Sequence, residues 1–273
     1  MLKYFSSIFF IFVKFIFFRK NILTNRILFD IILLKFLLNL LLCKIKSYSG
    51  KSRKEKFMEK RFYSISSQKN PSIKLRAAAG HFATGSSHIS HYLDISELKS
   101  RASSAKDVAK ELAVPYFSKS DSDSNASVDV IVCMEGTEII AAYLAEELMQ
   151  GGINSDGGIQ ILTPVNSTNG NFIFYQNVQE KILNKNVLLM VATMSTGMTV
   201  NRALDCLKYY GGKLIGISAI FSAFPEVSDN QVHSLFSCED IPDYYFYRPS
   251  ACAICKSGRK LDAIINSEGY TKI

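Results

Sequence analysis

From residue 128 onward, the pattern of apolar positions switches repeatedly between strand and helix periods. Four apolar runs have the length of buried strands, and a fifth, shorter run is a further candidate: Val128–Met134, Ile159–Val165, Val187–Thr193, Leu214–Phe221 and, as the shorter one, Phe172–Tyr175. Helical spacing separates several of these runs. Continuously apolar strands that alternate with helices are typical of a parallel sheet covered on both faces. The pattern therefore predicts an α/β fold with a doubly wound parallel sheet.

Helical spacing is clearest in two segments of this region. Glu138–Met149 carries apolar residues on one face and ends at Gly151-Gly152, which predicts a helix with a glycine terminator. A second helix is expected from about Val200 to Tyr210, before Gly211-Gly212. Upstream, the spacing of Leu98–Leu112 predicts one amphipathic helix. Tyr63–Gly80 is polar and weakly patterned, and Ser118–Ser127 is a loop by composition.

The N-terminal 57 residues form a hydrophobic, basic leader. Two apolar runs, Tyr4–Phe18 and Ile27–Cys43, are each interrupted by charge and are short for the roughly 20 residues that cross a bilayer. Three interpretations are open: a membrane anchor through residues 4–43, a signal peptide, or an over-extended start with Met58 as the initiator. No clean small-residue cleavage site follows the apolar region, which disfavours the signal peptide. We favour Met58 as the start, which makes the expected location cytoplasmic.

Charge and cysteine content narrow the class of protein further. The net charge of +8 belongs to the leader, because the first 62 residues contain only Asp30, Glu55 and Glu59 as acids and the rest is nearly balanced. A nucleic-acid partner is therefore not expected. The six cysteines are scattered, and Cys133 and Cys206 fall in apolar patterns that predict buried thiols. This usage favours a reducing compartment over a disulfide framework.

A candidate phosphate site follows the Val187–Thr193 strand. The turn Ser195–Thr199 contains three hydroxyls and Gly197, and it opens a helix. Backbone N–H groups and the dipole at a helix N-terminus favour an anion, and glycine lets the backbone come close to it. The alternative is an ordinary turn capped by Ser or Thr. Neither GxGxxG nor GxxxxGK[ST] occurs, which argues against a dinucleotide fold and a P-loop.

A second loop, Cys133–Glu138, lies at the end of the Val128–Met134 strand and also opens a helix. In an open α/β sheet the carboxyl ends of the strands form the ligand crevice, so the two loops are expected to face one ligand with two phosphate-bearing ends. The alternative for Glu135 and Glu138 is that they are first-turn carboxylates favoured by the helix dipole.

Histidines and cysteines gather in two further places. Gly80–Tyr92 holds three of the four His, and a polar loop that contacts a base or phosphate through His81, Thr84 and His88 is weighed equally with an ordinary surface loop. Zinc ranks below both, because no Cys or acid lies among these His at a ligand spacing. Cys252-Ala-Ile-Cys255 is half a zinc site without a second pair. Completion by Cys238, by His233 or by another subunit has no support, so we favour a reduced, redox-sensitive pair and assign no metal ligands.

Taken together, the motifs carry a family resemblance. From about Leu75 to Ile273 the chain resembles type I phosphoribosyltransferases, and it is similar in particular to bacterial orotate phosphoribosyltransferase-like proteins. The stretches that carry the resemblance are Gly80–Thr84, Val132–Glu138, Val191–Thr199, Tyr209–Gly212, Gly216–Ser222 and Cys252–Lys256.

The resemblance implies a fold, an activity and a ligand. It implies a phosphoribosyltransferase-like sheet, residues 128–222, with a small hood formed by residues 58–127 and 223–273. It implies transfer of ribose 5-phosphate from phosphoribosyl pyrophosphate to a nitrogenous base, with orotate as the candidate base, Mg²⁺ as cofactor and a homodimer as assembly. The residues implied to grip the 5-phosphate are Ser195, Thr196, Gly197, Met198 and Thr199, and those implied to form the pyrophosphate loop are Glu135, Gly136, Thr137 and Glu138.

Two departures from the family pattern keep a second function open. Two adjacent acids normally precede the phosphate turn, and this chain has Ala192 and Thr193 there. The orotate enzymes also carry a mobile Lys-rich loop, whereas Thr163–Gln179 contains no Lys or Arg. The first hypothesis is therefore a phosphoribosyltransferase with orotate or a related base. The alternative is a non-catalytic module that binds a phosphoribosyl compound or nucleotide and regulates a partner.

Overall fold

The computed structural model describes residues 61–117, 127–154, 157–266 and 269–273. The leader and Met58 lie outside the described residues, as does nearly all of the expected loop Ser118–Ser127. Within the described part, no helix is long and apolar enough to cross a membrane.

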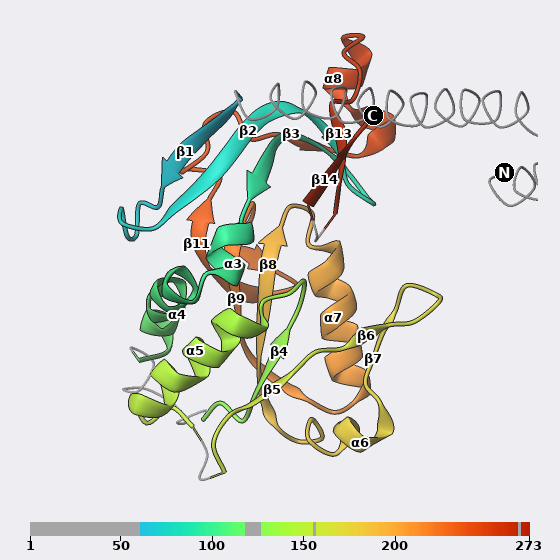
Figure 1. Cartoon of the computed structure of the whole chain (residues 1–273). Coiled ribbons are helices and arrows are strands. Elements are labelled where there is room, and N and C mark those ends of the chain that lie inside the picture. The colour runs from blue at the N-terminus through green and yellow to red at the C-terminus, as the bar shows by residue number, and fades with distance from the viewer. Residues whose placement is uncertain (1–60, 118–126, 155–156, 267–268) are drawn as a thin grey trace, which may run out of the picture. The chain divides into compact units, whose positions relative to one another are not determined.

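A core sheet and the helices around it make up the lower part of Figure 1. Its elements are β4 (Val130–Cys133), α5 (Glu138–Gln150), β5 (Gln160–Leu162), β8 (Asn186–Met194), α7 (Met198–Tyr209), β9 (Lys213–Ser222), β10 (Glu226–Val227) and β11 (Asn230–Ser237). Between β5 and β8 the chain forms β6 (Val165–Asn166), β7 (Phe172–Ile173) and α6 (Gln176–Gln179).

The second sheet, which we call the hood, lies beyond the carboxyl ends of β4 and β8 (Figure 1). Its strands are β1 (Phe62–Ser66), β2 (Lys74–Ala83), β3 (His88–Asp94), β12 (Phe246–Tyr247), β13 (Ala263–Asn266) and β14 (Gly269–Lys272). The helical elements next to these strands in the chain are α3 (Ser96–Ser100), α4 (Ala102–Phe117), the 3-10 turn η2 (Pro249–Ala251) and α8 (Ala253–Lys256). The hood therefore combines segments from both ends of the described chain, as expected from the resemblance.

The core sheet has the order β10-β11-β9-β8-β4-β5, and the neighbours from β11 to β5 are all parallel. In chain order its parallel strands run 2-1-3-4-5, which is a doubly wound arrangement. The predicted α/β fold class is confirmed. The strand order reverses between β4 and β8, and in such sheets the crevice at the reversal is where ligands bind.

Alternate residues of the central strands face two different layers. On β4, Ile131 and Cys133 join the cluster under α4 and α5, whereas Val130 and Val132 join the cluster under α7. Because both faces are covered, the central strands are apolar at most positions, and this is why they read as nearly continuous apolar runs. The predicted burial of Cys133 and Cys206 is confirmed.

Two predictions about the N-terminal segment are wrong in detail. The helix expected over Leu98–Leu112 is two helices, α3 and α4, because Arg101 between them adopts an extended backbone with ψ of 116°. The weakly patterned Tyr63–Gly80 contains most of β1 and most of β2. Ala77 and Ala78 of β2 are fully buried, and small apolar residues of this kind do not stand out in a hydropathy pattern.

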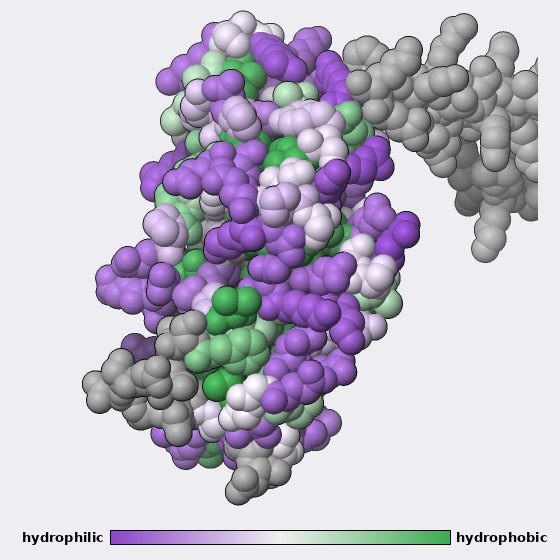
Figure 2. Space-filling view, turned by 90° about the vertical axis from the view of Figure 1, so that its left-hand side faces the viewer, coloured by the Kyte–Doolittle hydropathy of each residue, from purple (hydrophilic) through white to green (hydrophobic). Residues whose placement is uncertain are grey.

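The core also extends beyond residues 128–222. β11 pairs in parallel with β9 although it lies in the C-terminal segment, and α4 packs against α5. Viewed from the side of β1 and α4, the surface is largely hydrophilic, with a small apolar group in its lower half (Figure 2).

Candidate functional site

The two predicted loops meet at the reversal of the strand order. β4 and β8 pair in parallel up to Cys133 and Met190, so the turns that follow them leave the sheet at the same edge. One turn leads into α5 and the other into α7. The two expected ligand loops therefore lie side by side, as the sequence predicts.

The loop after β4 has an unusual backbone. Glu135 has φ of 60° and Gly136 has φ of 74°, so two consecutive residues adopt the left-handed conformation. For Glu135 this conformation costs on the order of 1 kcal/mol. The ammonium of Lys99, on α3, donates a hydrogen bond to the Glu135 carbonyl at 2.8 Å. Lys99 thus holds the strained loop and places a positive charge beside it.

The loop after β8 reaches α7 through Gly197, which has φ of 72°. Gly197 is the N-cap residue and has no side chain that could satisfy the first N–H groups of α7. The N-terminus of α5 resembles it, since the side chain of its N-cap residue, Thr137, makes no capping bond. Two helices of twelve and thirteen residues thus direct uncapped, partially positive N-termini to one edge of the sheet.

The Glu135 carboxylate connects the two loops. Its Oε2 accepts a hydrogen bond from the backbone N–H of Thr193 at 3.3 Å. Burial raises the pKa of this carboxyl above its usual value, and the Thr193 N–H and Lys99 act against that rise. An acid is therefore present at the end of β8, but it is supplied by the neighbouring loop and not by residues 192 and 193.

A cleft of about 370 Å³ lies between this edge and the hood. Its volume is in the range of small-molecule sites. The hood side contributes aliphatic and aromatic residues, among them Ile89, Tyr92 and Ile265. Among the described residues that line the cleft, Glu135 is the acid and Lys99 is the cation.

Tyr244 joins the C-terminal segment to the phosphate turn. Its hydroxyl lies 2.8 Å from the Ser195 hydroxyl, and its ring packs against Phe221 with centroids 4.9 Å apart. Burial raises the pKa of Tyr244 to about 12, although the Ser195 hydrogen bond acts in the opposite direction. The phenol therefore remains a neutral hydrogen-bonding partner at the cleft.

Some of the predicted site residues line the cleft and others do not. Those that line it are Thr84, Glu135, Gly136 and Ser195. Those outside the lining include Thr196, Gly197, Met198 and Thr199, which surround the N-terminus of α7. Ala192 and Thr193 line the cleft.

The remaining four predicted residues are engaged elsewhere. The Thr137 hydroxyl is buried and donates to the carbonyl oxygen of Met134 at 2.9 Å, so this side chain braces the loop instead of facing the cleft. The Glu138 carboxylate accepts from Thr163. His81 and His88 lie outside the cleft lining, with their ring nitrogens toward Cys252 and Cys255.

Most of the cleft lining was not predicted from the sequence, and Lys99 and Tyr244 are the two missed residues that contact the predicted loops. Lys99 is 36 residues from its partner Glu135, and Tyr244 is 49 residues from Ser195. Neither belongs to a motif, and no local spacing could have assigned them to the site. A cation was to be expected near the loops on chemical grounds, but only the packing of α3 against the carboxyl edge identifies which lysine it is.

No family model and no curated protein matches the chain. Solved structures that the chain resembles include orotate, adenine and hypoxanthine-guanine phosphoribosyltransferases. An orotate phosphoribosyltransferase of Mycobacterium tuberculosis H37Rv, in complex with inorganic phosphate, is 12% identical with a TM-score of 0.40, over 56% of this chain and 80% of that one. An adenine phosphoribosyltransferase of Thermoanaerobacter pseudethanolicus is 12% identical with a TM-score of 0.39, over 67% and 98%. A hypoxanthine-guanine phosphoribosyltransferase of Bacillus anthracis is 18% identical with a TM-score of 0.37, over 52% and 80%. A likeness at this level does not carry a function from those proteins to this chain.

Proposed function

We propose that the chain is a phosphoribosyltransferase that binds phosphoribosyl pyrophosphate in the cleft and at the N-terminus of α7, and transfers its ribose 5-phosphate to a nitrogenous base. The observation that carries the proposal is the meeting of two uncapped helix N-termini at the reversal point of the sheet. A ligand with a phosphate at one end and a pyrophosphate at the other matches two such anion sites. Orotate is one candidate base, and hypoxanthine, guanine and adenine are others.

The two loops take different ends of this ligand. The N–H groups at the start of α7 and the hydroxyls of Ser195, Thr196 and Thr199 bind the 5-phosphate. The backbone of Glu135 and Gly136 binds the pyrophosphate, and the Lys99 ammonium neutralises part of its charge. Lys99 thereby provides the positive charge that Thr163–Gln179 lacks. The supporting contact is the 2.8 Å hydrogen bond from Lys99 to the Glu135 carbonyl, which places the ammonium on this loop.

Mg²⁺ fits this cleft through a single carboxylate. Mg²⁺ is commonly held by one or two carboxylates together with substrate phosphate oxygens. In the cleft lining that the structure describes, Glu135 is the carboxylate, and its Oε2 already accepts from the Thr193 N–H. Glu135 and the pyrophosphate would hold the ion, which would supply charge neutralisation to the leaving group.

The hood provides the base site. The side chains of Ile89, Tyr92 and Ile265 form an apolar wall that suits a planar heterocycle. In the reaction, a base nitrogen forms a bond to C1′ of the ribose while the bond from C1′ to the pyrophosphate oxygen breaks. The base loses its proton and pyrophosphate leaves with the electron pair. Because little covalent chemistry falls to the protein, positioning and charge stabilisation supply most of the catalysis.

A second candidate function is a non-catalytic module that binds the same class of ligand and regulates a partner. The observation that favours it is the pair Ala192 and Thr193 at the end of β8, where carboxylates would hold the ribose hydroxyls. The acid that contacts this point is Glu135, whose carboxylate accepts from the Thr193 N–H. Both candidate functions require the same class of ligand, but only the transferase turns it over.

The test measures pyrophosphate release and ligand binding on the full chain. Phosphoribosyl pyrophosphate, Mg²⁺ and one base at a time are supplied, with orotate, uracil, hypoxanthine, guanine and adenine as the panel. Base-dependent release supports the transferase and identifies the base. Binding without release for every base overturns the transferase and leaves the regulatory module. Failure to bind phosphoribosyl pyrophosphate in calorimetry overturns both.

A further inference from the structure

Four metal-ligating side chains converge outside the cleft. They are His81 on β2, His88 on β3, Cys252 just before α8 and Cys255 within it, and their ligand atoms all lie within 4.8 Å of one another. The two histidines lie on the hairpin of β2 and β3, and His81 is 171 residues before Cys252 in the chain. We propose that this cluster is a structural zinc site, with two imidazole and two thiolate ligands.

The distances agree with a tetrahedral ion. Zinc–nitrogen bonds of about 2.0–2.1 Å and zinc–sulfur bonds of about 2.3 Å give tetrahedron edges of about 3.3 Å for N–N and about 3.6 Å for N–S pairs. Nε2 of His81 and Nδ1 of His88 are 3.2 Å apart. The His81 Nε2 lies 3.5 Å from Cys252 Sγ and 3.6 Å from Cys255 Sγ, and the His88 Nδ1 lies 3.3 Å from Cys255 Sγ. These four distances are close to the edges of such a tetrahedron, and all four ligand atoms lie within 4.8 Å of one another.

The other ring nitrogen of His81 is oriented as a metal ligand needs. Nδ1 lies 2.9 Å from the carbonyl oxygen of Arg259, and a carbonyl can only accept, so the proton is on Nδ1. The lone pair of Nε2 then points into the cluster. Zinc-binding histidines usually donate their second ring nitrogen to a carbonyl or carboxylate in this way, which fixes the tautomer.

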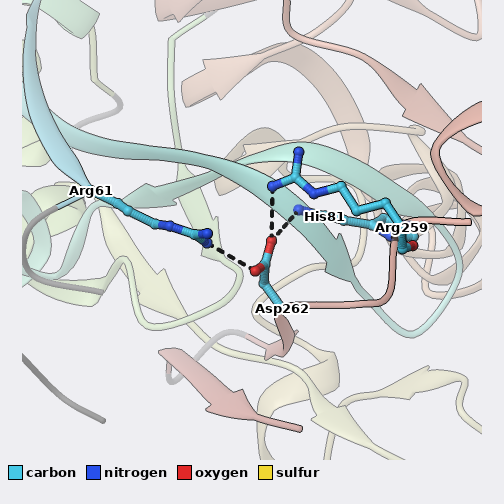
Figure 3. Close-up of polar contacts among 4 residues, drawn as sticks. All are labelled: Arg61, His81, Arg259 and Asp262. Atoms are coloured by element: carbon cyan, nitrogen blue, oxygen red, sulfur yellow. Dashed lines mark hydrogen bonds and ion pairs between the residues drawn. The ribbon is translucent and has the colours of Figure 1, made fainter. Parts of the chain in front are cut away.

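The backbone of His81 is held by an ion-pair network (Figure 3). Asp262 accepts the His81 N–H at 2.8 Å and returns its own N–H to the His81 carbonyl at 2.7 Å. The same carboxylate pairs with Arg61 at 2.8 Å and with Arg259 at 3.3 Å. Arg259 and Asp262 both contact His81, and both lie shortly after the Cys pair in the chain. The network therefore fixes the position of the cysteine turn relative to the hairpin.

The cysteine turn is itself shaped for a metal. Cys252 and Cys255 have the C-x-x-C spacing of structural zinc sites. The backbone N–H of Cys255 donates to Cys252 Sγ at 3.4 Å, so the turn itself holds this sulfur in place. Gly258, with φ of 79°, then reverses the chain, and its N–H donates to the Cys255 carbonyl.

Zinc explains the cluster better than a redox pair does. A disulfide would require the two sulfurs alone, and it would give no role to two imidazoles that point at the same place. A Cys₂His₂ set with four protein ligands is typical of closed, structural zinc sites. None of the four residues is among those that line the cleft, while Ile265 and Asn266 of the neighbouring β13 are. The ion would therefore tie α8 to the hood strands that form one wall of the cleft.

The test replaces zinc by cobalt and counts metal in the full chain. We expect about one zinc per chain after purification without chelators. The apo chain, kept reduced, should take up about one Co²⁺ with thiolate charge-transfer bands and the intense d–d bands of tetrahedral coordination. Cys255→Ser and His88→Asn should each lower the metal content at least tenfold. Cys238→Ser changes a partly exposed free cysteine away from the cluster and should retain about one ion per chain.

Three outcomes would overturn the proposal. They are a reduced full chain without bound zinc or cobalt, an octahedral cobalt spectrum, and equal metal content in Cys255→Ser and Cys238→Ser. Circular dichroism of each variant, together with cobalt titration of the apo chain, guards against a variant that merely fails to fold. The metal content and the cobalt spectrum do not depend on phosphoribosyl pyrophosphate, so the zinc proposal is tested separately from the proposed transferase.

Discussion

Replacement of Lys99 by Met should weaken phosphoribosyl pyrophosphate binding about 10- to 30-fold. The Lys99 ammonium is held on the pyrophosphate loop by its 2.8 Å bond to the Glu135 carbonyl. A bound phosphate oxygen on that loop would lie about 5 Å away, where a pair of unit charges interacts by roughly 3 kcal/mol at an effective dielectric constant near 20. Lys99 is half-buried, so solvent reduces this interaction energy to about 1.5–2 kcal/mol. Because about 1.4 kcal/mol corresponds to a tenfold change in Kd, the expected loss of affinity is about 10- to 30-fold.

The assay is calorimetric titration of the full chain with phosphoribosyl pyrophosphate, and separately with pyrophosphate, at low and high salt. Lys110→Met removes the same charge from an exposed position on α4 and is the matched control. The loss in Lys99→Met should shrink at high salt, because screening weakens the charge interaction. Unchanged affinity in Lys99→Met, or an equal loss in Lys110→Met, would refute the placement of the pyrophosphate beside Lys99.

Three other perturbations test the structure around the site. Gly197→Ala should destabilise the fold by about 1–2 kcal/mol and weaken inorganic phosphate binding, because φ is 72° and the new Cβ would meet Val227 at 3.2 Å. Tyr116→Phe should lower the free energy of unfolding by about 1–2 kcal/mol, because it leaves the buried Ser218 hydroxyl without its 2.9 Å partner. Glu135→Gln should raise stability at pH 7 and leave it unchanged near pH 4. Burial raises the pKa of this carboxyl, so the folded state prefers the protonated form. The free energy of unfolding therefore falls as the pH rises from the pKa of the unfolded state, near 4.5, through the higher pKa of the folded state.

Urea unfolding measures all three changes. The Tyr116→Phe effect should largely disappear when Ser218 is also replaced by Ala, and full additivity of the two substitutions would contradict the hydrogen bond. An equal shift of Glu135→Gln at pH 4 and pH 7 would show that the effect is not electrostatic. Normal phosphate binding by Gly197→Ala would contradict the role of this turn.

The sequence predicted the regular core well because the signals there are local. α5 begins at Glu138 as expected, and β8 and β9 match their apolar runs within one or two residues. The division at Arg101 could not be predicted in this way, since both α3 and α4 continue the same helical spacing across it. The hood strands β1 and β2 were also missed. β1 buries only Ile65, and the Ala and Gly residues in the middle of β2 carry little apolar contrast.

The two candidate loops, Cys133–Glu138 and Ser195–Thr199, could be predicted because a turn between a strand and a helix is specified by residues that are neighbours in the chain. The contacts that complete the site depend on distant segments. Lys99, Tyr244 and the pairing of Glu135 with the end of β8 follow from how helices and hood pack on the carboxyl edge.

By itself, the sequence determined the α/β class and the succession of core strands and helices along the chain, because hydrophobic period is a local property. Turn chemistry is local as well, and it predicted the two candidate anion loops. Tertiary structure alone decided which charges face the cleft. It also brought His81 and His88 to Cys252 and Cys255, where the sequence had shown a histidine loop and half a zinc site as separate features. Side chains 171 residues apart meet because β12 pairs with β3 and β13 pairs with β2, on either side of the cysteine turn.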